Sequence, residues 1–424
     1  MAKYESIDDA NKAVAQKIID AQPRFVDVVP AKNVIPELSE QLILHAGPPI
    51  AFEDMPAPVQ GSAIGAALFE GWAKDEAAAR KVCEKVRFAP NHHFHAVAPM
   101  GGIITGNMPV FVVENATDGN RAYTAIHEGE GKVLRYGVYD QWTHDNLVWL
   151  RDVLGPAFAK ALRLLPDGGL PLNPIIAQAV TMGDDFHVRN TAASSLLFRQ
   201  LAPKLVQAAP PAKQLQSVLD FLSGNNEFFL TLAMVAGKAA LDAAAAVNDG
   251  SVVTCLTRNG REFGIRVSGL GDRWFTGPLT KLDTLYFPGF SDADACPDTG
   301  DSAILESYGF GGLVSVAAPA VQQLVGSGEG TFGDALATSD EQSEIVVTNN
   351  PNMPIPNWSF KGVPVGLDIR KIVSTGVAPL ITTPVMHRKA GIGMVGIGKC
   401  RAPMPCFEAA LEALAEARGI SPAS

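Results

Sequence analysis

The sequence predicts an α+β protein, in which mixed α/β segments at both ends flank a helical middle segment. Short β-rich runs between turn signals occur in the first and last thirds of the chain. Apolar residues at helical spacing fill the middle third. Gly and Pro number 40 and 30, which indicates many tight turns between short elements.

The first third alternates helices and strands. An apolar stripe from Ile7 to Ile18 predicts a helix that Pro23 ends. A strand is expected at 25–29, closed by Pro30. Further elements are predicted at 63–72 and 76–85 (helices) and at 110–113 (a strand).

The middle third reads as a bundle of helices. In residues 145–165, apolar residues recur at helical spacing, and Gly155-Pro156 predicts a kink or a split. More helices are expected at 175–182, 191–201, 214–222 and 229–247. The last is apolar, but Lys238 and Asp242 interrupt it, so it reads as a buried helix and not as a membrane span.

The final third returns to α/β structure. Asn259-Gly260 lies between two β-rich runs, at 252–256 and 263–267, and so predicts a hairpin. Strands are expected at 343–348 and 379–383, and an amphipathic helix at 407–417. A chain of 424 residues exceeds one ordinary core. We therefore place an α/β domain at 1–142, a helical domain at 143–248 and an α/β domain at 249–424.

Charge and composition exclude several classes of protein. The 34 Lys and Arg against 44 Asp and Glu leave a net charge of -10, which argues against nucleic-acid binding. The first residues lack the apolar region of a secretory signal, and five Cys make no disulfide framework. We expect a cytoplasmic protein without a membrane span, and its apolar helices suggest a homo-oligomer.

Three His crowd into Asn91-His92-His93-Phe94-His95. In an extended segment His93 and His95 would share a face, which suits two ligands of a divalent metal. The imidazoles could instead act as acid/base groups, or could be neutral polar groups at a domain seam. No third ligand is evident, so the sequence requires no cofactor.

The run Met182–Asn190 is rich in side chains that carry chemistry, including Asp184, His187, Arg189 and Asn190. An Arg beside a helix start suits a carboxylate or a phosphate. One Asp is explained equally well as a helix cap. Capping does not explain the other three residues.

Two further groups lie in the last third. Asn259, Glu262, Arg266 and Arg273 gather around the predicted hairpin, either at a binding cleft or along a salt-bridged edge. Asp301-Ser302 precedes a predicted helix, where Asp301 is either an N-cap or part of a turn that holds phosphate.

Several segments together resemble the AllG-like family, which includes the YlbE and YahG proteins. They run in order along nearly the whole chain: Leu44-His-Ala-Gly-Pro-Pro-Ile, Val112-Val-Glu-Asn, Gly131-Lys-Val-Leu-Arg-Tyr-Gly, Met182-Gly-Asp, Asn259 to Thr276, Leu285-Tyr-Phe-Pro-Gly, Gly300-Asp-Ser-Ala-Ile and Gly366-Leu-Asp-Ile-Arg-Lys-Ile-Val. The resemblance implies a subunit of oxamate carbamoyltransferase, which turns oxalurate and phosphate into oxamate and carbamoyl phosphate in allantoin use. It also implies an FdrA-like partner subunit and a third subunit.

Such a reaction needs anchors for two anions, donors for an oxyanion and a proton for the leaving amide. The catalytic candidates are His187, His93, Asn190, Asp184 and Glu262. The substrate-binding candidates are Arg189, Asn259, Arg266, Arg273, Asp301 and Ser302. Three alternatives remain: a metal-dependent amidohydrolase acting on a ureido compound, with His93 and His95 as ligands, a non-catalytic scaffold for a synthetase-like partner, and a paralogue that acts on a different ureido acid.

Overall fold

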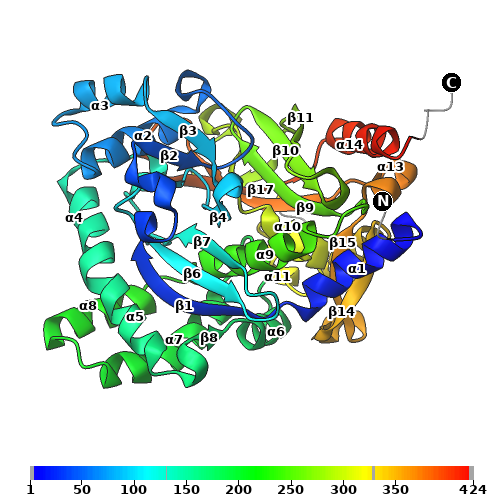
Figure 1. Ribbon diagram of the computed structural model, residues 1–424, viewed down its shortest axis with the longest axis horizontal. Coiled ribbons are helices and arrows are strands. Elements are labelled where there is room, and N and C mark those ends of the chain that lie inside the picture. The colour runs from blue at the N-terminus through cyan, green and yellow to red at the C-terminus, as the bar shows by residue number, and fades with distance from the viewer. Residues whose placement is uncertain (1–3, 130, 327–329, 420–424) are drawn as a thin grey trace.

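The computed structural model describes residues 4–129, 131–326 and 330–419. It contains both helices and open sheets, so the α+β prediction is confirmed (Figure 1). The helices are α1 (Ile7–Asp20), α2 (Ala57–Phe69), α3 (Glu76–Cys83), α4 (Gln141–Trp149), α5 (Gly155–Arg163), α6 (Asn173–Thr181), α7 (Thr191–Gln207), α8 (Ala212–Ser223), α9 (Phe229–Ala245), α10 (Ile304–Tyr308), α11 (Pro319–Gln322), α12 (Phe332–Ser343), α13 (Ile369–Thr375) and α14 (Met404–Ala417).

The strands form several small sheets, mostly antiparallel. They are β1 (Pro23–Pro30), β2 (Leu42–His45), β3 (Arg87–Pro90), β4 (Ala96–Val97), β5 (Ile103–Ile104), β6 (Pro109–Asn115), β7 (Arg121–Ala125), β8 (Leu170–Pro171), β9 (Val253–Asn259), β10 (Glu262–Val267), β11 (Phe275–Pro278), β12 (Asp283–Tyr286), β13 (Thr299–Gly300), β14 (Val346–Ile355), β15 (Lys361–Leu367), β16 (Leu380–Met386) and β17 (Met394–Arg401). Their orders are β4-β7-β6-β1-β8, β11-β10-β9-β13, β12-β17-β16, β14-β15 and β3-β2-β5.

Helix α9 runs through the centre of the molecule (Figure 1). It packs against α1, α10 and the strands β6, β7 and β9. Nearly every residue of α9 is buried, including Lys238, whose ammonium lies 2.6 Å from Asp242 one turn later. The sequence-based expectation of a buried helix is therefore confirmed. In the part of the chain that the structure describes, no helix is long and apolar enough to cross a membrane.

The middle of the chain is helical, as predicted, from α4 to α9. The expected break at Gly155-Pro156 takes the form of a π-helical segment, Leu150–Leu154, between α4 and α5. Pro156 lies in the first turn of α5, and the helical backbone continues into it from the π-helical segment, where the Gly155 amide donates to the carbonyl of Leu150. The predicted hairpin is also confirmed, because β9 ends at Asn259 and β10 pairs with it from Phe263 onward.

The largest cluster of buried apolar residues draws on all three predicted segments. It includes Val14 and Phe111 from the first, Leu197 and Leu232 from the second, and Val363 from the third. Strand β8, in the helical segment, also completes the first sheet by pairing with β1. The three-domain division therefore stays a prediction, and the segments share one main core.

Candidate active site

A cavity of about 420 Å³ collects polar side chains from distant parts of the chain. Arg135 comes from a short 3-10 turn, His187 from the turn before α7, and Glu227 from the residues just before α9. Pro384 and Ile397, which pair across β16 and β17, line another wall. An apolar cavity with a few convergent polar groups is the usual form of a small-molecule site.

The turn that carries His187 is strained. Phe186 has a backbone φ of 67°, in the left-handed region that bulky residues rarely adopt. Its buried ring packs edge-on against Phe310, with the ring centroids 4.9 Å apart. Tertiary packing thus holds a conformation that costs backbone energy, and such conformations cluster at functional positions.

Both ring nitrogens of His187 have partners. Nδ1 lies 2.7 and 2.9 Å from the two carboxylate oxygens of Glu306, and Nε2 lies 2.8 Å from Oγ of Ser302. Glu306 is fully buried and also accepts hydrogen bonds from the amides of Gly312 and Thr382, each at 3.3 Å. A Cβ at Gly311 would lie 2.0 Å from Glu306 Oε1, so this close approach needs glycine.

The two Asp of this turn have structural roles. Asp184 accepts the amides of Ala192 and Ala193 at 3.2 and 2.7 Å, so it caps the start of α7. Burial raises the pKa of Asp184 to about 6. Asp185 accepts the amides of Val188 and Arg189 and so closes the turn. The cap interpretation of Asp184 therefore describes its contacts, and a catalytic role for it stays a prediction.

Arg135 is a buried cation on the wall of this cavity. It is 7% exposed, and among the residues that the structure describes no carboxylate forms an ion pair with its guanidinium. Its Nη2 donates to the carbonyl of Gly129 at 3.3 Å, while its Nε has no hydrogen-bond partner. The nearby Glu128 accepts the backbone amide of Arg135 at 3.1 Å, and burial raises the pKa of this carboxyl. A buried charge is normally paired, so the guanidinium is suited to an anionic ligand.

Neighbouring groups complete this polar end of the cavity. Burial, together with the charge of Arg135, holds the pKa of His127 well below its usual value, so this imidazole stays neutral. Within the described part of the chain, Nδ1 of His127 has no hydrogen-bond partner. Asn190 donates to Glu227 at 2.8 Å, and its own side-chain oxygen is unpartnered. The unpartnered atoms are the kind that a bound ligand satisfies.

Glu227 gives the first testable prediction. Burial raises its pKa from 4.5 to about 7, so the folded protein keeps this proton between those pH values while the unfolded chain releases it. Stability should therefore fall as pH rises through this window. Glu227→Gln removes this titrating group. The free energy of unfolding of the variant, relative to that of wild type, should therefore rise by about 2–3 kcal/mol between pH 4.5 and pH 8. Urea unfolding at both pH values measures this difference, and a constant difference would contradict it.

A second cavity, of about 590 Å³, holds the other His candidates. Residues Asn91–Phe94 form a 3-10 turn and not the extended segment that was expected. Consequently His93 and His95 do not lie side by side as the two metal ligands of an extended strand. His93 accepts a hydrogen bond from Trp274 at 2.8 Å, and His95 lies 2.8 Å from Asp242. Among residues 4–129, 131–326 and 330–419, no group of three or more His, Cys, Asp or Glu could hold a metal ion. The extended-arm geometry that motivated the metal prediction was wrong.

Arg266 also lines this second cavity, as the alternation along β10 suggested. It pairs with the exposed Asp272 and lies over the Trp274 ring at 5.7 Å. Lys238 lines the same cavity, with Asp242 as its partner. The cations of this cavity therefore have carboxylate partners, unlike Arg135.

Asn259 and Asp301 belong to the framework between the cavities. Asn259 is buried, donates to the carbonyl of Pro48 at 3.1 Å and accepts the amides of Arg261 and Glu262. Asp301 is buried and accepts hydrogen bonds from several segments. Its neighbour Ser302 faces His187.

Three candidates lie away from both cavities. Arg189 donates to the carbonyl of Met182 at 3.2 Å and lies 3.8 Å from Asp184. Arg273 is exposed and stacks over Phe275. Glu262 accepts a hydrogen bond from Thr276 at 3.3 Å along the hairpin. Glu262 and Arg273 thus lie along the hairpin edge, which was the alternative to a cleft, whereas Arg266 faces the second cavity.

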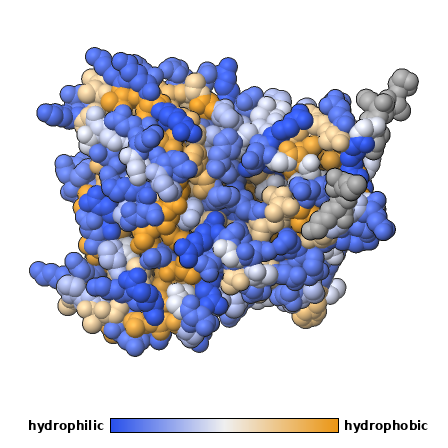
Figure 2. Space-filling model, in the orientation of Figure 1, coloured by the Kyte–Doolittle hydropathy of each residue, from blue (hydrophilic) through white to orange (hydrophobic). Residues whose placement is uncertain are grey.

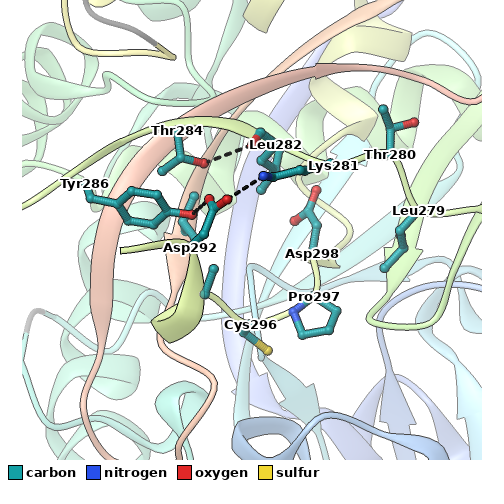
Figure 3. Close-up of a pocket in the computed structure, with 12 residues that line it drawn as sticks. Leu279, Thr280, Lys281, Leu282, Thr284, Tyr286, Asp292, Cys296, Pro297 and Asp298 are labelled. Atoms are coloured by element: carbon teal, nitrogen blue, oxygen red, sulfur yellow. Dashed lines mark hydrogen bonds and ion pairs between the residues drawn. The ribbon is translucent and has the colours of Figure 1, made fainter. Parts of the chain in front are cut away.

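A third cavity, of about 330 Å³, lies on the other face of the sheet β12–β17–β16 (Figure 3). Its charges are already paired: Lys281 reaches Asp292, and the Tyr286 hydroxyl donates to the same carboxylate at 2.7 Å. Asp298 is held by Arg258, with nitrogen to oxygen distances of 2.8 and 3.0 Å. This cavity offers a charged ligand fewer free partners than the one around Arg135.

The structure therefore joins His187, Asn190 and Ser302, and adds four residues that the sequence did not suggest: Arg135, His127, Glu227 and Glu306. A signal existed for one of them, because Arg135 lies inside the Gly131 to Gly137 segment. The others come from segments whose proximity depends on the tertiary fold.

Comparison with known proteins gives a consistent result. Residues 86–302 match the family model described as oxamate carbamoyltransferase subunit AllG. The chain is 50% identical to the oxamate carbamoyltransferase subunit AllG of Escherichia coli strain K12, over 98% of this chain and 100% of that protein. It is 40% identical to the protein YahG of the same organism, over 98% of this chain and 88% of YahG.

A solved structure agrees with the fold as well. A conserved protein of unknown function from Enterococcus faecalis V583 superposes with a TM-score of 0.93 at 44% identity. The match covers 97% of this chain and 98% of that one. With half of its residues identical to a curated relative over almost its full length, the chain belongs to the family of oxamate carbamoyltransferase subunit AllG.

Proposed function

We propose that this chain is the part of an oxamate carbamoyltransferase in which oxalurate and phosphate are converted into oxamate and carbamoyl phosphate, as a step in allantoin use. The observation that carries the proposal is the buried guanidinium of Arg135, which forms no ion pair with any residue that the structure describes and lies in the same cavity as His187. The relationship to a carbamoyltransferase subunit supplies the reaction class.

The chemistry fits the groups in the cavity. Oxalurate and oxamate both end in a carboxylate, which the planar guanidinium of Arg135 can bind through two parallel hydrogen bonds. His187 supplies the acid/base group, since the leaving amide nitrogen of oxamate must gain a proton. His127, neutral and adjacent, can donate or accept a hydrogen bond without adding charge.

Partners follow from the family. We expect the chain to work with an FdrA-like subunit and a third subunit, and to form homo-oligomers within that assembly. Figure 2 shows apolar residues in a broken band from top to bottom of the left half of one face. Large apolar side chains remain exposed elsewhere too, such as Trp142 at 55% and Phe360 at 70%. Exposed apolar surface is compatible with subunit contacts.

The test is carbamoyl phosphate formation from oxalurate and phosphate, measured with this chain alone and with its partner subunits. We expect activity in the assembled enzyme. A complex that forms but yields no carbamoyl phosphate would contradict the reaction. Activity that is unchanged when this chain's cavity is altered would instead favour the scaffold role. Arg121→Met, at an exposed arginine paired with Glu114, is the matched control for changes at Arg135.

A further inference from the structure

Ser302, His187 and Glu306 have the arrangement of a serine, a base and an orienting carboxylate. The Ser302 hydroxyl lies 2.8 Å from Nε2 of His187, and Glu306 lies 2.7 Å from Nδ1. Ser302 stands just before α10, Glu306 lies within that helix, and His187 comes from the strained turn more than a hundred residues earlier in the chain. Nothing in capping or hairpin formation requires this set.

The hydrogen bonds around Glu306 indicate which atoms of the three side chains donate and which accept. The Glu306 carboxylate also accepts two backbone amides on Oε1, which stabilise its ionised form, and an ionised Glu306 leaves the shared proton on Nδ1 of His187. Nε2 is then free to accept the proton of the Ser302 hydroxyl. A serine hydroxyl is a weak nucleophile until an adjacent base removes its proton.

The set adjoins the cavity through His187. His187 lines the cavity that contains Arg135. Ser302 keeps 4% of its surface exposed, whereas Glu306 has none. The carboxylate thus sits in the core, and the hydroxyl lies one hydrogen bond from a ring on the cavity wall.

We propose that Ser302 is a nucleophile that carries the carbamoyl group as a covalent ester between two half-reactions. This inference rests on the proposed function and specifies its mechanism. In the first half-reaction, Ser302 Oγ attacks the ureido carbonyl carbon of oxalurate and loses its proton to His187. The bond between that carbon and the oxamate nitrogen breaks, and His187 returns the proton to this nitrogen.

In the second half-reaction, an oxygen of hydrogen phosphate attacks the carbamoyl carbon. The bond to Ser302 Oγ breaks, and carbamoyl phosphate forms. The proton of hydrogen phosphate passes through His187 to Ser302. The enzyme thereby returns to its starting state, and no proton is gained or lost. A buried site suits this sequence of steps, because it keeps water away from the carbamoyl ester.

Isotope exchange distinguishes this route from direct attack by phosphate. The assembled enzyme is incubated with oxalurate and isotope-labelled oxamate, without phosphate. A covalent intermediate lets labelled oxamate take the carbamoyl group back, so label enters oxalurate. Direct transfer needs phosphate and gives no exchange. Mass spectrometry of the quenched enzyme should show the Ser302 peptide with one carbamoyl group in place of one hydrogen.

Variants add an independent test. Ser302→Ala should lower both exchange and turnover by at least about a thousandfold. Ser307→Ala is the matched control, because Ser307 is buried on α10 close to Ser302 and its hydroxyl has no hydrogen-bond partner among the described residues. Glu306 is a positioning residue: Glu306→Gln should lower kcat about a hundredfold or more with KM nearly unchanged, and Glu306→Asp should restore part of the loss.

Each result has one meaning. Carbamoyl phosphate formation without isotope exchange, or with Ser302→Ala as active as wild type, overturns the covalent route and leaves the proposed function standing. Absence of carbamoyl phosphate from the wild-type assembly overturns the proposed function itself. If Ser302→Ala does not fold, exchange by the wild-type enzyme still decides the question.

Discussion

Replacing Arg135 by Met is expected to lower kcat/KM for oxalurate by about thirtyfold to a few thousandfold, because a buried charge-assisted contact is worth about 2–5 kcal/mol. The guanidinium is 7% exposed and forms no ion pair with any described carboxylate. Arg135→Lys keeps the charge but loses the planar fork, so it should recover only part of the loss. Steady-state kinetics of the assembled enzyme measure both effects.

Stability should move in the opposite direction to activity. Burying a cation that forms no ion pair with the described residues costs free energy, so Arg135→Met should unfold at the same temperature as wild type or higher. The substitution removes a hydrogen bond to Gly129 at 3.3 Å, the approach to the Tyr136 ring at 4.5 Å and the attraction of the guanidinium to the carboxyls of Glu128 and Glu227, whose pKa values are raised by burial. The control variant Arg121→Met should leave kcat/KM unchanged. A folded Arg135→Met enzyme with wild-type kcat/KM would rule Arg135 out as the anion anchor.

The sequence is informative where the signal is local. Asn259-Gly260 predicts a hairpin because a tight turn must join two adjacent strands, and the apolar run around Lys238 predicts a buried helix. Met182–Asn190 stands out because capping accounts for only part of its side chains. His187 from that run does reach a cavity.

The sequence is misleading where an assumed local conformation is wrong. The pairing of His93 with His95 requires an extended strand, but the chain turns there and His95 adopts a left-handed conformation with φ of 54°. No rule of composition anticipates that turn. The Arg residues near the hairpin are close in sequence, yet Arg266 and Arg273 point to different neighbours.

The remaining site residues could not be predicted because their partners are distant. Glu306 lies 119 positions from His187, and its approach depends on a glycine at 311. Arg135 becomes distinctive only when the fold buries it without an ion-pair partner. Sequence patterns report spacing along one element, whereas these features arise from packing between elements.

Asp301→Ala is expected to remove most of the stability of the fold. The buried carboxylate accepts hydrogen bonds from the amides of Gly47 and Ala98, the Thr257 hydroxyl and the Asn91 side chain, at 2.6 to 3.1 Å. Each buried donor left without a partner costs about 1–3 kcal/mol, so the loss should exceed about 5 kcal/mol. Urea unfolding monitored by circular dichroism measures it, and Asp292→Ala, at an exposed site, should leave the midpoint nearly unchanged.

Asp301→Asn separates the charge from the hydrogen bonds. Burial alone would raise the pKa of Asp301, but His92, Thr257 and Asn91 stabilise the carboxylate and hold its pKa to about 2. The stability that this carboxylate contributes is thus present above its ordinary pKa of 3.8 and is lost as pH falls toward 2. Asn at position 301 has no ionised form and cannot contribute this stability. As pH falls from 5 to 2, the free energy of unfolding of the variant should therefore decrease by about 2 kcal/mol less than that of wild type. Equal acid sensitivity in the two proteins would mean that the ionised Asp301 does not hold these segments together. Because Ser302 is the next residue, the same carboxylate fixes the position from which its hydroxyl reaches His187.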